Sequence, residues 1–387
     1  MPTYPTYKLG DILSYEQPTN YIVESTEYDD SYPTPVLTAG KSFILGYTNE
    51  TKGVYDKLPV IIFDDFTTAS QFVDFKFKVK SSAMKILSCN EEIADIKYMY
   101  YLMQITHIQS DTHKRYWISD YSKIPVSLPP LPTQHQIVSR IESLFAELDK
   151  AEEHLRTAQQ QLKIYKQAVL NHWLNNEDGK WETVPIKEII SVISNGSTPK
   201  ADKMFSKGEI QFIKVYNLNF DGSINLSKEP VFIDRETHET LLKRSQTKQG
   251  DVLINIVGPP LGKVSIVPDG DKEYNINQAI VMFRPNEFVI SKFLAYYLMS
   301  PRVIEWLNST SKATAGQYNV KVSTCREIMF PKISLPEQQR IVQEIETRLS
   351  QAEAAEARIA ESLQKTEALR QSILKKAFGG ELVQYNL

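Results

Sequence analysis

Two long segments of the chain share one spacing of apolar positions. In residues 133–174 the apolar side chains recur at alternating steps of four and three, from Ile137 to Val169, and residues 337–378 repeat this pattern in a slightly looser form. Neither segment contains Gly or Pro. A heptad pattern of this length predicts a long helix with one apolar seam. Two such helices in one chain pack most simply against each other, antiparallel.

Both predicted helices belong to an internal repeat. The sequence Leu-Pro-Thr-Gln at residues 131–134 recurs as Leu-Pro-Glu-Gln at residues 335–338, 204 positions later, and the match continues without a gap to the ends of both helices. Proline is well tolerated at the start of a helix, where its missing N–H has no partner to lose. Glycines are expected to end the helices, Gly179 after the first and Gly379-Gly380 after the second.

The repeat predicts four segments of two kinds. The first head covers residues 1–130 and the first long helix 131–178, while the second head covers residues 179–334 and the second long helix 335–387. This order predicts a pseudo-twofold, mixed α/β (α+β) protein, in which two heads are separated by two long helices packed as an antiparallel coiled coil. Within the heads, residue types favour strands at 59–63, 75–79, 252–257 and 279–283, and short helices at 96–102 and 291–299.

Composition places the chain among ordinary globular proteins. It has 387 residues, of which 42% are hydrophobic and 24% charged, and no apolar run is long enough to cross a membrane. The chain start has no basic, apolar signal-peptide pattern, and its two cysteines, Cys89 and Cys325, form neither a disulfide framework nor a zinc site. We therefore expect a cytoplasmic protein with no bound metal.

Charge is distributed unevenly along the chain. The net charge is −3, but residues 179–334 carry 20 Lys and Arg against 16 Asp and Glu, a net of +4. Residues 1–130 carry 12 against 16, a net of −4. Any contact with DNA is thus expected to use local patches, or to rely on a more basic partner for most of the phosphate contacts.

The sequence lacks the catalytic signatures of several enzyme classes. The glycines of residues 258–264 are separated by three residues where a phosphate loop requires four, and Val264 stands where Ser or Thr should bind magnesium, so a turn is predicted. Asp64 and Asp65 are adjacent on a predicted strand and point to opposite faces, which argues against a shared metal. The chain also lacks a dinucleotide fingerprint and the Asn/Asp-Pro-Pro-aromatic tetrapeptide of amino-methyltransferases. A non-catalytic protein is predicted.

The repeated Leu-Pro-x-Gln-x-x-Ile-Val helix, placed after each of two dissimilar heads, resembles the specificity subunit of Type I restriction–modification systems. This resemblance covers essentially the whole chain. Residues 195–199, 250–254, 258–264 and 276–279 resemble the second target-recognition domain of that family, and residues 35–41, 45–50, 63–68 and 80–85 are similar to one subgroup of first domains.

The resemblance implies a function in DNA recognition. Each head would read one half of a split site in double-stranded DNA, and the paired helices would set the unread spacer. Two modification subunits would bind S-adenosylmethionine and methylate adenine at N6, and up to two restriction subunits would cleave with ATP and Mg²⁺ in defence against foreign DNA. This chain itself would hold no cofactor and no catalytic residue.

Polar loops flanked by glycine, and basic residues beside aromatic ones, are the candidates for DNA contact, because these side chains read base edges and bind phosphates. The clusters at residues 113–117 and 311–318 precede the two long helices by similar distances. In the first head the candidates are Thr38, Lys41, Tyr47, Thr48, Asn49, Lys80, Ser81, Ser82, Lys114, Arg115 and Trp117; in the second they are Asn195, Ser197, Thr198, Lys200, Lys214, Asn217, Lys312, Thr314, Gln317, Tyr318 and Asn319.

Two alternatives stay open at this point. The first is a coiled-coil scaffold that joins two protein-binding heads without DNA recognition, and the second is a self-sufficient DNA-modifying enzyme. The missing methylase tetrapeptide and phosphate loop count against the enzyme. Salt-sensitive binding to duplex DNA separates recognition from scaffolding, since a scaffold has no reason to release counterions from DNA.

Overall fold

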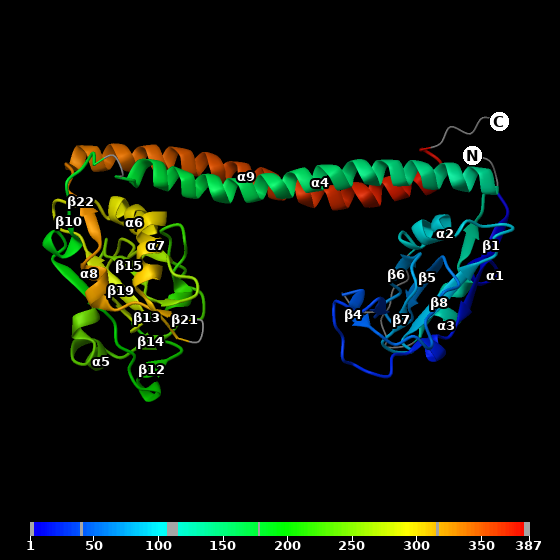
Figure 1. Cartoon of the computed structure of the whole chain (residues 1–387), viewed down its shortest axis with the longest axis horizontal. Helices are drawn as coiled ribbons and strands as arrows, with labels where there is room; N and C mark the ends of the chain where they lie inside the picture. The colour runs from blue at the N-terminus through cyan, green and yellow to red at the C-terminus, as the bar shows by residue number, and fades with distance from the viewer. Residues whose placement is uncertain (1–3, 39–41, 107–114, 177–178, 315–316, 383–387) are drawn as a thin grey trace. The chain divides into compact units, whose positions relative to one another are not determined.

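A computed structural model describes residues 4–38, 42–106, 115–176, 179–314 and 317–382, and within residues 312–318 only the backbone is described. The chain divides into two compact units (Figure 1). Unit 1 comprises Met1–Arg156 and Ala360–Leu387, and unit 2 comprises Thr157–Ile359. Each unit therefore holds one head together with part of both long helices.

The long helices are α4 (Leu131–Leu174) and α9 (Leu335–Phe378), and both begin at the leucine of the repeated Leu-Pro. Helix α9 ends immediately before the glycine pair, as predicted, and Gly380 has a φ of 79°. Gly179 does not end α4, which was the expectation. The helix stops five residues earlier, and beyond its end the Asn176 side chain hydrogen-bonds both the N–H and the carbonyl of Trp181 at 2.7 and 2.6 Å.

The two helices pack antiparallel within each unit. In unit 1, Ile137 and Ile141 near the start of α4 share a core with Leu374 and Ala377 near the end of α9. In unit 2 the end of α4 shares a core with the start of α9, and Lys166 pairs with Glu356 at 2.6 Å. The antiparallel packing predicted from the heptad spacing is therefore confirmed.

The first head is built on a four-stranded antiparallel sheet of order β2-β8-β5-β6, beside a three-stranded sheet of order β4-β3-β7 and a β1-β9 pair at the base. Helix α2 lies between the larger sheet and α4 (Figure 1). The elements are β1 (Thr6–Lys8), α1 (Leu9–Ile12), β2 (Leu13–Glu16), η1 (Pro18–Tyr21), β3 (Thr34–Leu37), β4 (Ile44–Thr48), β5 (Val60–Asp64), β6 (Ser70–Val73), β7 (Lys78–Val79), β8 (Met84–Cys89), α2 (Ile96–Met103), α3 (Tyr116–Ser119), η2 (Tyr121–Lys123) and β9 (Pro125–Ser127).

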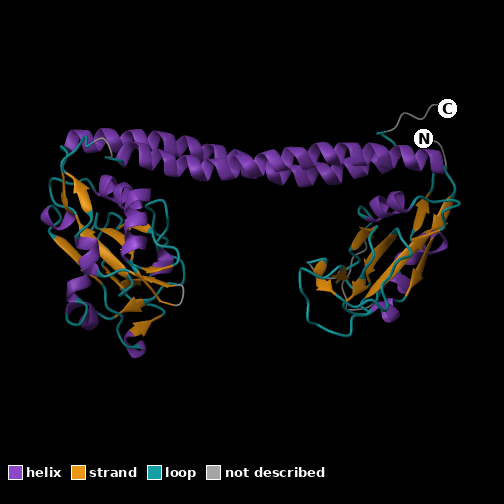
Figure 2. Ribbon diagram, in the orientation of Figure 1, coloured by secondary structure: helices purple, strands orange, loops and turns teal. Residues whose placement is uncertain are grey.

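The second head has a four-stranded antiparallel sheet of order β11-β19-β15-β17, a second sheet of order β12-β14-β13-β18, a small sheet β16-β21-β20 and a basal pair β10-β22. Figure 2 shows these strands with their flanking helices. The elements are β10 (Thr183–Pro185), η3 (Ile186–Glu188), β11 (Val192–Asn195), η4 (Ala201–Lys203), β12 (Met204–Phe205), β13 (Ile210–Ile213), η5 (Val215–Asn217), β14 (Phe232–Ile233), α5 (Arg235–Glu239), η6 (Lys243–Ser245), β15 (Val252–Asn255), β16 (Val257–Gly258), β17 (Val264–Ile266), β18 (Tyr274–Ile276), β19 (Ile280–Arg284), α6 (Ser291–Met299), α7 (Pro301–Thr310), β20 (Lys312–Thr314), β21 (Gln317–Asn319), α8 (Val322–Arg326) and β22 (Met329–Pro331).

The two heads share one framework despite their dissimilar sequences. Strands β2, β8, β5 and β6 correspond in order and direction to β11, β19, β15 and β17. The register agrees as well, since Asp64 pairs with Met84 where Asn255 pairs with Ile280. Each head also has a second sheet with one parallel pair, β3 with β7 in the three-stranded sheet of the first head and β13 with β18 in the four-stranded sheet β12-β14-β13-β18 of the second.

Most of the expected elements lie where the residue types placed them. Helix α6 has the predicted bounds, and α2 extends one residue further than predicted. The strand expected over residues 75–79 is shorter, because only Lys78–Val79 pair with a neighbour as a strand. None of the helices in the described part of the chain is both long and apolar enough to cross a membrane.

Candidate nucleic-acid interface

Each head is joined to a long helix by the glutamine of the repeated Leu-Pro-x-Gln motif. Gln134 Oε1 accepts a hydrogen bond from the Asp95 N–H at 2.9 Å, and its Nε2 donates to the carbonyls of Ile93 and Pro129 at 2.8 and 2.7 Å. The Gln134 side chain is fully buried. This glutamine therefore ties the segment before α2 to the first turn of α4.

The second head uses the same joint. Gln338 Oε1 accepts from the Ile290 N–H at 2.9 Å, and its Nε2 donates to the carbonyls of Phe288 and Ile333 at 2.8 and 3.1 Å. An ion pair also links each head to its long helix, Lys97 with Glu142 in one head and Lys292 with Glu346 in the other, both at 2.6 Å. The motif of the sequence repeat is thus a structural joint, and it orients both heads on their helices in the same way.

The joint defines which end of each head is available for a ligand. Strand β8 runs from Met84 toward the joint segment that holds Asp95, and β19 likewise runs from Ile280 toward Ile290. We call the opposite end, where β8 and β19 begin, the loop end. Loops after β2, β3, β5 and β7 meet there in the first head, and loops after β11, β13, β15 and β18 meet there in the second. Polar groups for recognition can be presented at this end by a rigid sheet.

Several predicted site residues occupy matching positions at the two loop ends. The N–H of Lys80 donates to the Leu37 carbonyl at 2.8 Å, and the N–H of Asn277 donates to the Ile213 carbonyl at 3.1 Å, so Lys80 and Asn277 are structural equivalents. By the same pairing Thr38 corresponds to Lys214, which follow β3 and β13. The structure leaves Asn49, Lys80, Ser81, Ser82, Arg115, Thr198, Lys200 and Asn319 exposed, and Thr38, Tyr47, Asn195, Ser197 and Lys214 partly buried.

Three predicted contacts are interior side chains, which goes against DNA contact by these groups. Trp117 is 1% exposed, and its ring packs against Phe63 and Tyr121. Its backbone N–H donates to Asp65 Oδ1 at 2.9 Å, which holds this residue against the loop after β5. Thr48 is the last residue of β4 and points into the core. The basic and aromatic run that contains Trp117 was interpreted as a surface cluster, but its aromatic members face the sheet.

Asn217 is the third interior residue. Its Oδ1 accepts from the Lys214 N–H at 2.9 Å, and its Nδ2 donates to the carbonyls of Asn225 and Lys228, both at 2.9 Å. All these bonds hold the loop that leaves β13, so the role of Asn217 is to shape the loop. Lys41 and Lys114 lie outside the described residues, as do the side chains of Lys312, Thr314, Gln317 and Tyr318.

The loop after β11 lies directly on the end of the sheet. A Cβ on Gly196 would stand 1.8 Å from the Ile276 carbonyl oxygen, so only glycine fits there. The next residue, Ser197, accepts a hydrogen bond from Arg244 Nη2 at 3.0 Å. Arg244 is exposed and basic, yet it was missing from the predicted site. Its partner lies 47 residues away in sequence, so no local pattern could have signalled the pairing.

The segments tested for catalysis have structural roles. Residues 258–264 form a turn around Asn255, whose Nδ2 donates to the Pro260 carbonyl and whose Oδ1 accepts from the Lys263 N–H, both at 2.9 Å. Asp64 Oδ1 accepts from the Phe66 N–H at 2.9 Å, whereas Asp65 pairs with Lys85 at 3.3 Å. No group of three His, Cys, Asp or Glu side chains with metal-binding geometry occurs among the described residues.

The protein is two-headed, in that two heads built on one framework are each fixed to a long helix by the same glutamine joint. A family model described as the Type I restriction modification DNA specificity domain matches residues 1–157 and 178–365. The chain belongs to this family, and the resemblance seen in the sequence is confirmed. It is a Type I restriction–modification DNA specificity subunit, which by family is non-catalytic.

Known relatives support this assignment. The chain is 34% identical over 360 residues to the specificity subunit of the Type I restriction enzyme EcoR124I/EcoR124II of Escherichia coli, which covers 87% of this chain and 84% of that protein. It is 29% identical over 279 residues to the EcoBI specificity subunit of Escherichia coli, over 66% of this chain and 58% of that one.

Two solved structures have the same fold. A chain from a structure describing complex assembly and conformational transition of the type I R-M system has a TM-score of 0.68 at 18% identity, with 98% of this chain and 99% of that one covered. The HsdS subunit from Thermoanaerobacter tengcongensis has a TM-score of 0.56 at 18% identity, with 98% of each chain covered.

Proposed function

We propose that this subunit recognises a bipartite site in double-stranded DNA, with each head reading one half-site through the groups at its loop end. The observation that carries the proposal is the duplication of framework and joint. Both heads keep the same four-stranded sheet and the same glutamine joint, while the loops at the loop ends differ in length and in side chains. A constant support with two different reading surfaces is what a split, asymmetric site requires.

The chemistry belongs to partner subunits in this proposal. Two modification subunits carry S-adenosylmethionine and methylate adenine at N6, and up to two restriction subunits cleave with ATP and Mg²⁺. The assembled complex acts in the cytoplasm, where it meets foreign DNA. The small net charge of −3 fits this division, because the partners then supply much of the phosphate contact.

A methylation map tests the proposal directly. The chain is co-expressed with the modification subunit of its own system in a host that lacks adenine methylation, and N6-methyladenine is mapped over the genome. We expect one split motif made of two short half-sites separated by a fixed unread spacer. Replacing the first head with that of another specificity subunit, while Gln134 is retained, should change one half-site only.

The opposite outcome would favour a scaffold. If the modification subunit is soluble and bound to this chain, and yet no motif is methylated, the heads do not direct methylation. Binding of the complex to duplex DNA is then measured at several salt concentrations. A scaffold gives no dependence on salt beyond that of the modification subunit alone, whereas a DNA-reading subunit adds to the slope.

A further inference from the structure

The strongest unassigned group at the loop ends is Arg244 in the second head. It lies in the 3-10 helix η6, between Leu242, two residues before it, and Ser245, directly after it, and both of these side chains are fully buried. Ser245 Oγ contacts the Asn275 side-chain amide at 2.7 Å, and that amide contacts His238 Nδ1 at 2.6 Å. The backbone that carries Arg244 is therefore anchored to β18 from inside the head.

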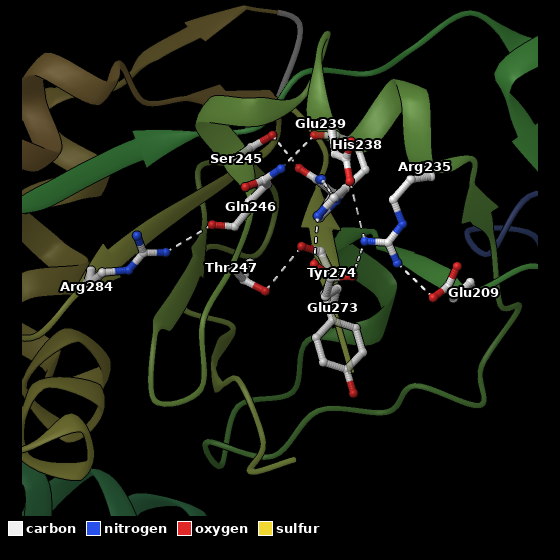
Figure 3. A network of polar contacts seen from close by, with 11 residues as sticks. Glu209, Arg235, His238, Glu239, Ser245, Gln246, Thr247, Glu273, Tyr274 and Arg284 are labelled. Carbon is white, nitrogen blue, oxygen red and sulfur yellow. Dashed lines mark hydrogen bonds and ion pairs between the residues drawn. The ribbon is translucent and has the colours of Figure 1, made fainter. Parts of the chain in front are cut away.

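The residue after this anchor is held as well. The Gln246 carbonyl accepts a hydrogen bond from Arg284 Nη2 at 3.0 Å (Figure 3). Arg284 is fixed in turn by Asp251 at 2.7 Å. Arg244 projects from a short segment that is held on one side by Leu242, which packs in the core with Phe212 of β13, and on the other by Ser245 and Gln246. A reading side chain on such a segment loses little conformational freedom of its backbone on binding.

Ser197 fixes the direction of the Arg244 guanidinium. Its Oγ lies 3.0 Å from Arg244 Nη2, and the loop that carries it is pressed against the sheet end at Gly196. The guanidinium has five N–H donors, and Ser197 uses one of them. The remaining donors are available to a ligand at the loop end.

The positive charge of Arg244 is also not neutralised by an ion pair within the described part of the chain. Within the described part of the chain no carboxylate lies within ion-pair distance of it, although the same head holds two arginines that are occupied. Arg235 pairs with Glu209 at 2.7 Å and Glu273 at 2.6 Å, and Arg284 pairs with Asp251. Arg244 is thus a positioned cation at the loop end with unused donors.

We propose that Arg244, oriented by Ser197, reads a guanine in the half-site of the second head. Arginine forms paired hydrogen bonds with guanine O6 and N7 in the major groove, which is the commonest specific contact between protein side chains and bases. The proposal rests on the proposed function, in which the loop ends read DNA. It extends that function by naming one base of the second half-site and the residue that selects this base.

The test compares four variants in the complex with the modification subunit. R244A removes the reading group, R244K keeps the charge without the planar fork, S197A removes the orienting hydroxyl, and R235A serves as a matched arginine that is committed to carboxylates. Each complex is mapped for N6-methyladenine and is tested for binding to duplexes in which every base of the second half-site is varied in turn.

The expected result is a change at one position of one half-site. For R244A, the preference for guanine there should fall from the roughly 5- to 150-fold of one bidentate contact to about onefold. R244K and S197A should lose part of it, and R235A should keep the wild-type motif. An unchanged first half-site shows in every case that the complex is folded and assembled.

Two outcomes would overturn the inference. In one, R244A reads the same motif as the wild type. In the other, R244A binds all sequences more weakly to the same degree and its salt slope falls by about one, which identifies a phosphate contact. Failure of the proposed function is distinguishable, because the wild-type complex would then give no split motif at all.

Discussion

The two heads fill the same pair of buried positions with opposite kinds of side chain, charged in the first head and apolar in the second. In the first head, Asp65 and Lys85 form an ion pair at 3.3 Å, and their side chains are only 3% and 1% exposed. In the second head the equivalent positions are Ile256 and Val281. The backbone fixes this equivalence, because Tyr116 N–H donates to the Asp65 carbonyl at 2.9 Å where Val320 N–H donates to the Ile256 carbonyl at 2.9 Å.

The difference shows that the framework itself does not require the ion pair. Burying two charges costs desolvation that their attraction barely repays, and apolar replacements of similar volume are often neutral or stabilising. Asp65 nevertheless has a further task, since its Oδ1 accepts from the Trp117 N–H at 2.9 Å. In the first head, Asp65 thus fixes the start of α3 against the loop after β5. In the second head, Ile256 cannot accept such a hydrogen bond.

The largest expected effect comes from breaking this pair. Asp65→Ile or Lys85→Val alone leaves one buried charge without its partner, and each should lower the free energy of unfolding by about 3–5 kcal/mol. The double variant copies the second head and should recover most of that loss. The whole chain is unfolded with denaturant, and its unfolding is monitored by hydrogen exchange. Exchange in peptides from the first head measures the effect, and peptides from the second head are the internal control.

A double variant as unstable as the sum of the single variants would contradict this comparison. It would mean that the Asp65–Lys85 pair contributes net stability that the apolar pair cannot supply. The hydrogen bond from the Trp117 N–H to Asp65 would then be the first contact to examine, because Ile cannot accept it.

A second prediction concerns what the heads share. Gln134→Ala and Gln338→Ala each remove three hydrogen bonds and leave a buried N–H unpaired, so each should cost about 2–4 kcal/mol, to a similar degree in both heads. Gln136 and Gln339 are exposed neighbours, and their replacement by Ala should cost less than about 0.5 kcal/mol. The four unfolding curves test this, and a large difference between the two buried glutamines would show that the joints are not equivalent.

The smallest predicted effect is a difference between the heads in how their stability depends on pH. In the second head, burial lowers the pKa of His238 below its usual 6.5, and nearby Arg235 adds to this, whereas Glu273 and Glu239 oppose it. The stability that neutral His238 contributes is present above pH 6.5 and is lost as the pH falls toward the lowered pKa. In the first head, burial would raise the pKa of Glu50, but the hydrogen bonds from Lys78 and two backbone N–H groups outweigh it, and the pKa lies below 4.5.

Acidification from pH 7 should therefore loosen the second head before the first. Hydrogen exchange between about pH 6.5 and pH 5, corrected for the intrinsic exchange rate, should show loss of protection around His238 and none around Glu50. His238→Gln should abolish the difference between the heads. Equal loss in both heads, or an unchanged difference in the variant, would assign the effect to other groups.

The sequence predicted the long helices well and the shared framework poorly. Heptad spacing and the repeated Leu-Pro-x-Gln are local patterns, so the extent and the pairing of α4 and α9 could be derived from them. The identical strand order of the two heads could not, because strands such as β5 and β8 pair over long distances and their sequences differ from those of β15 and β19. Sheet pairing depends on tertiary context more than on local preference.

The candidate site was predicted only in outline. Polar loops at Lys80–Ser82 and Asn195–Lys200 do lie at the loop ends. Thr48, Trp117 and Asn217 were chosen by residue type, yet each has interior partners that only the folded chain brings near. Arg244 was missed because its suitability as a contact residue depends on the folded chain. Ser197, which is distant in sequence, orients its guanidinium, and no carboxylate in the described part of the chain pairs with it.

The glutamine joint restricts the amino-acid sequence of the heads very little. Among the described residues, the Gln134 side chain hydrogen-bonds main-chain atoms alone, namely the Ile93 carbonyl, the Asp95 N–H and the Pro129 carbonyl. Gln338 does the same with Phe288, Ile290 and Ile333. Every amino acid offers a carbonyl, and every one except proline offers an N–H. Substitutions can therefore accumulate across a head while its attachment to the helix stays intact, so the loop ends can change in sequence without a change in the joint.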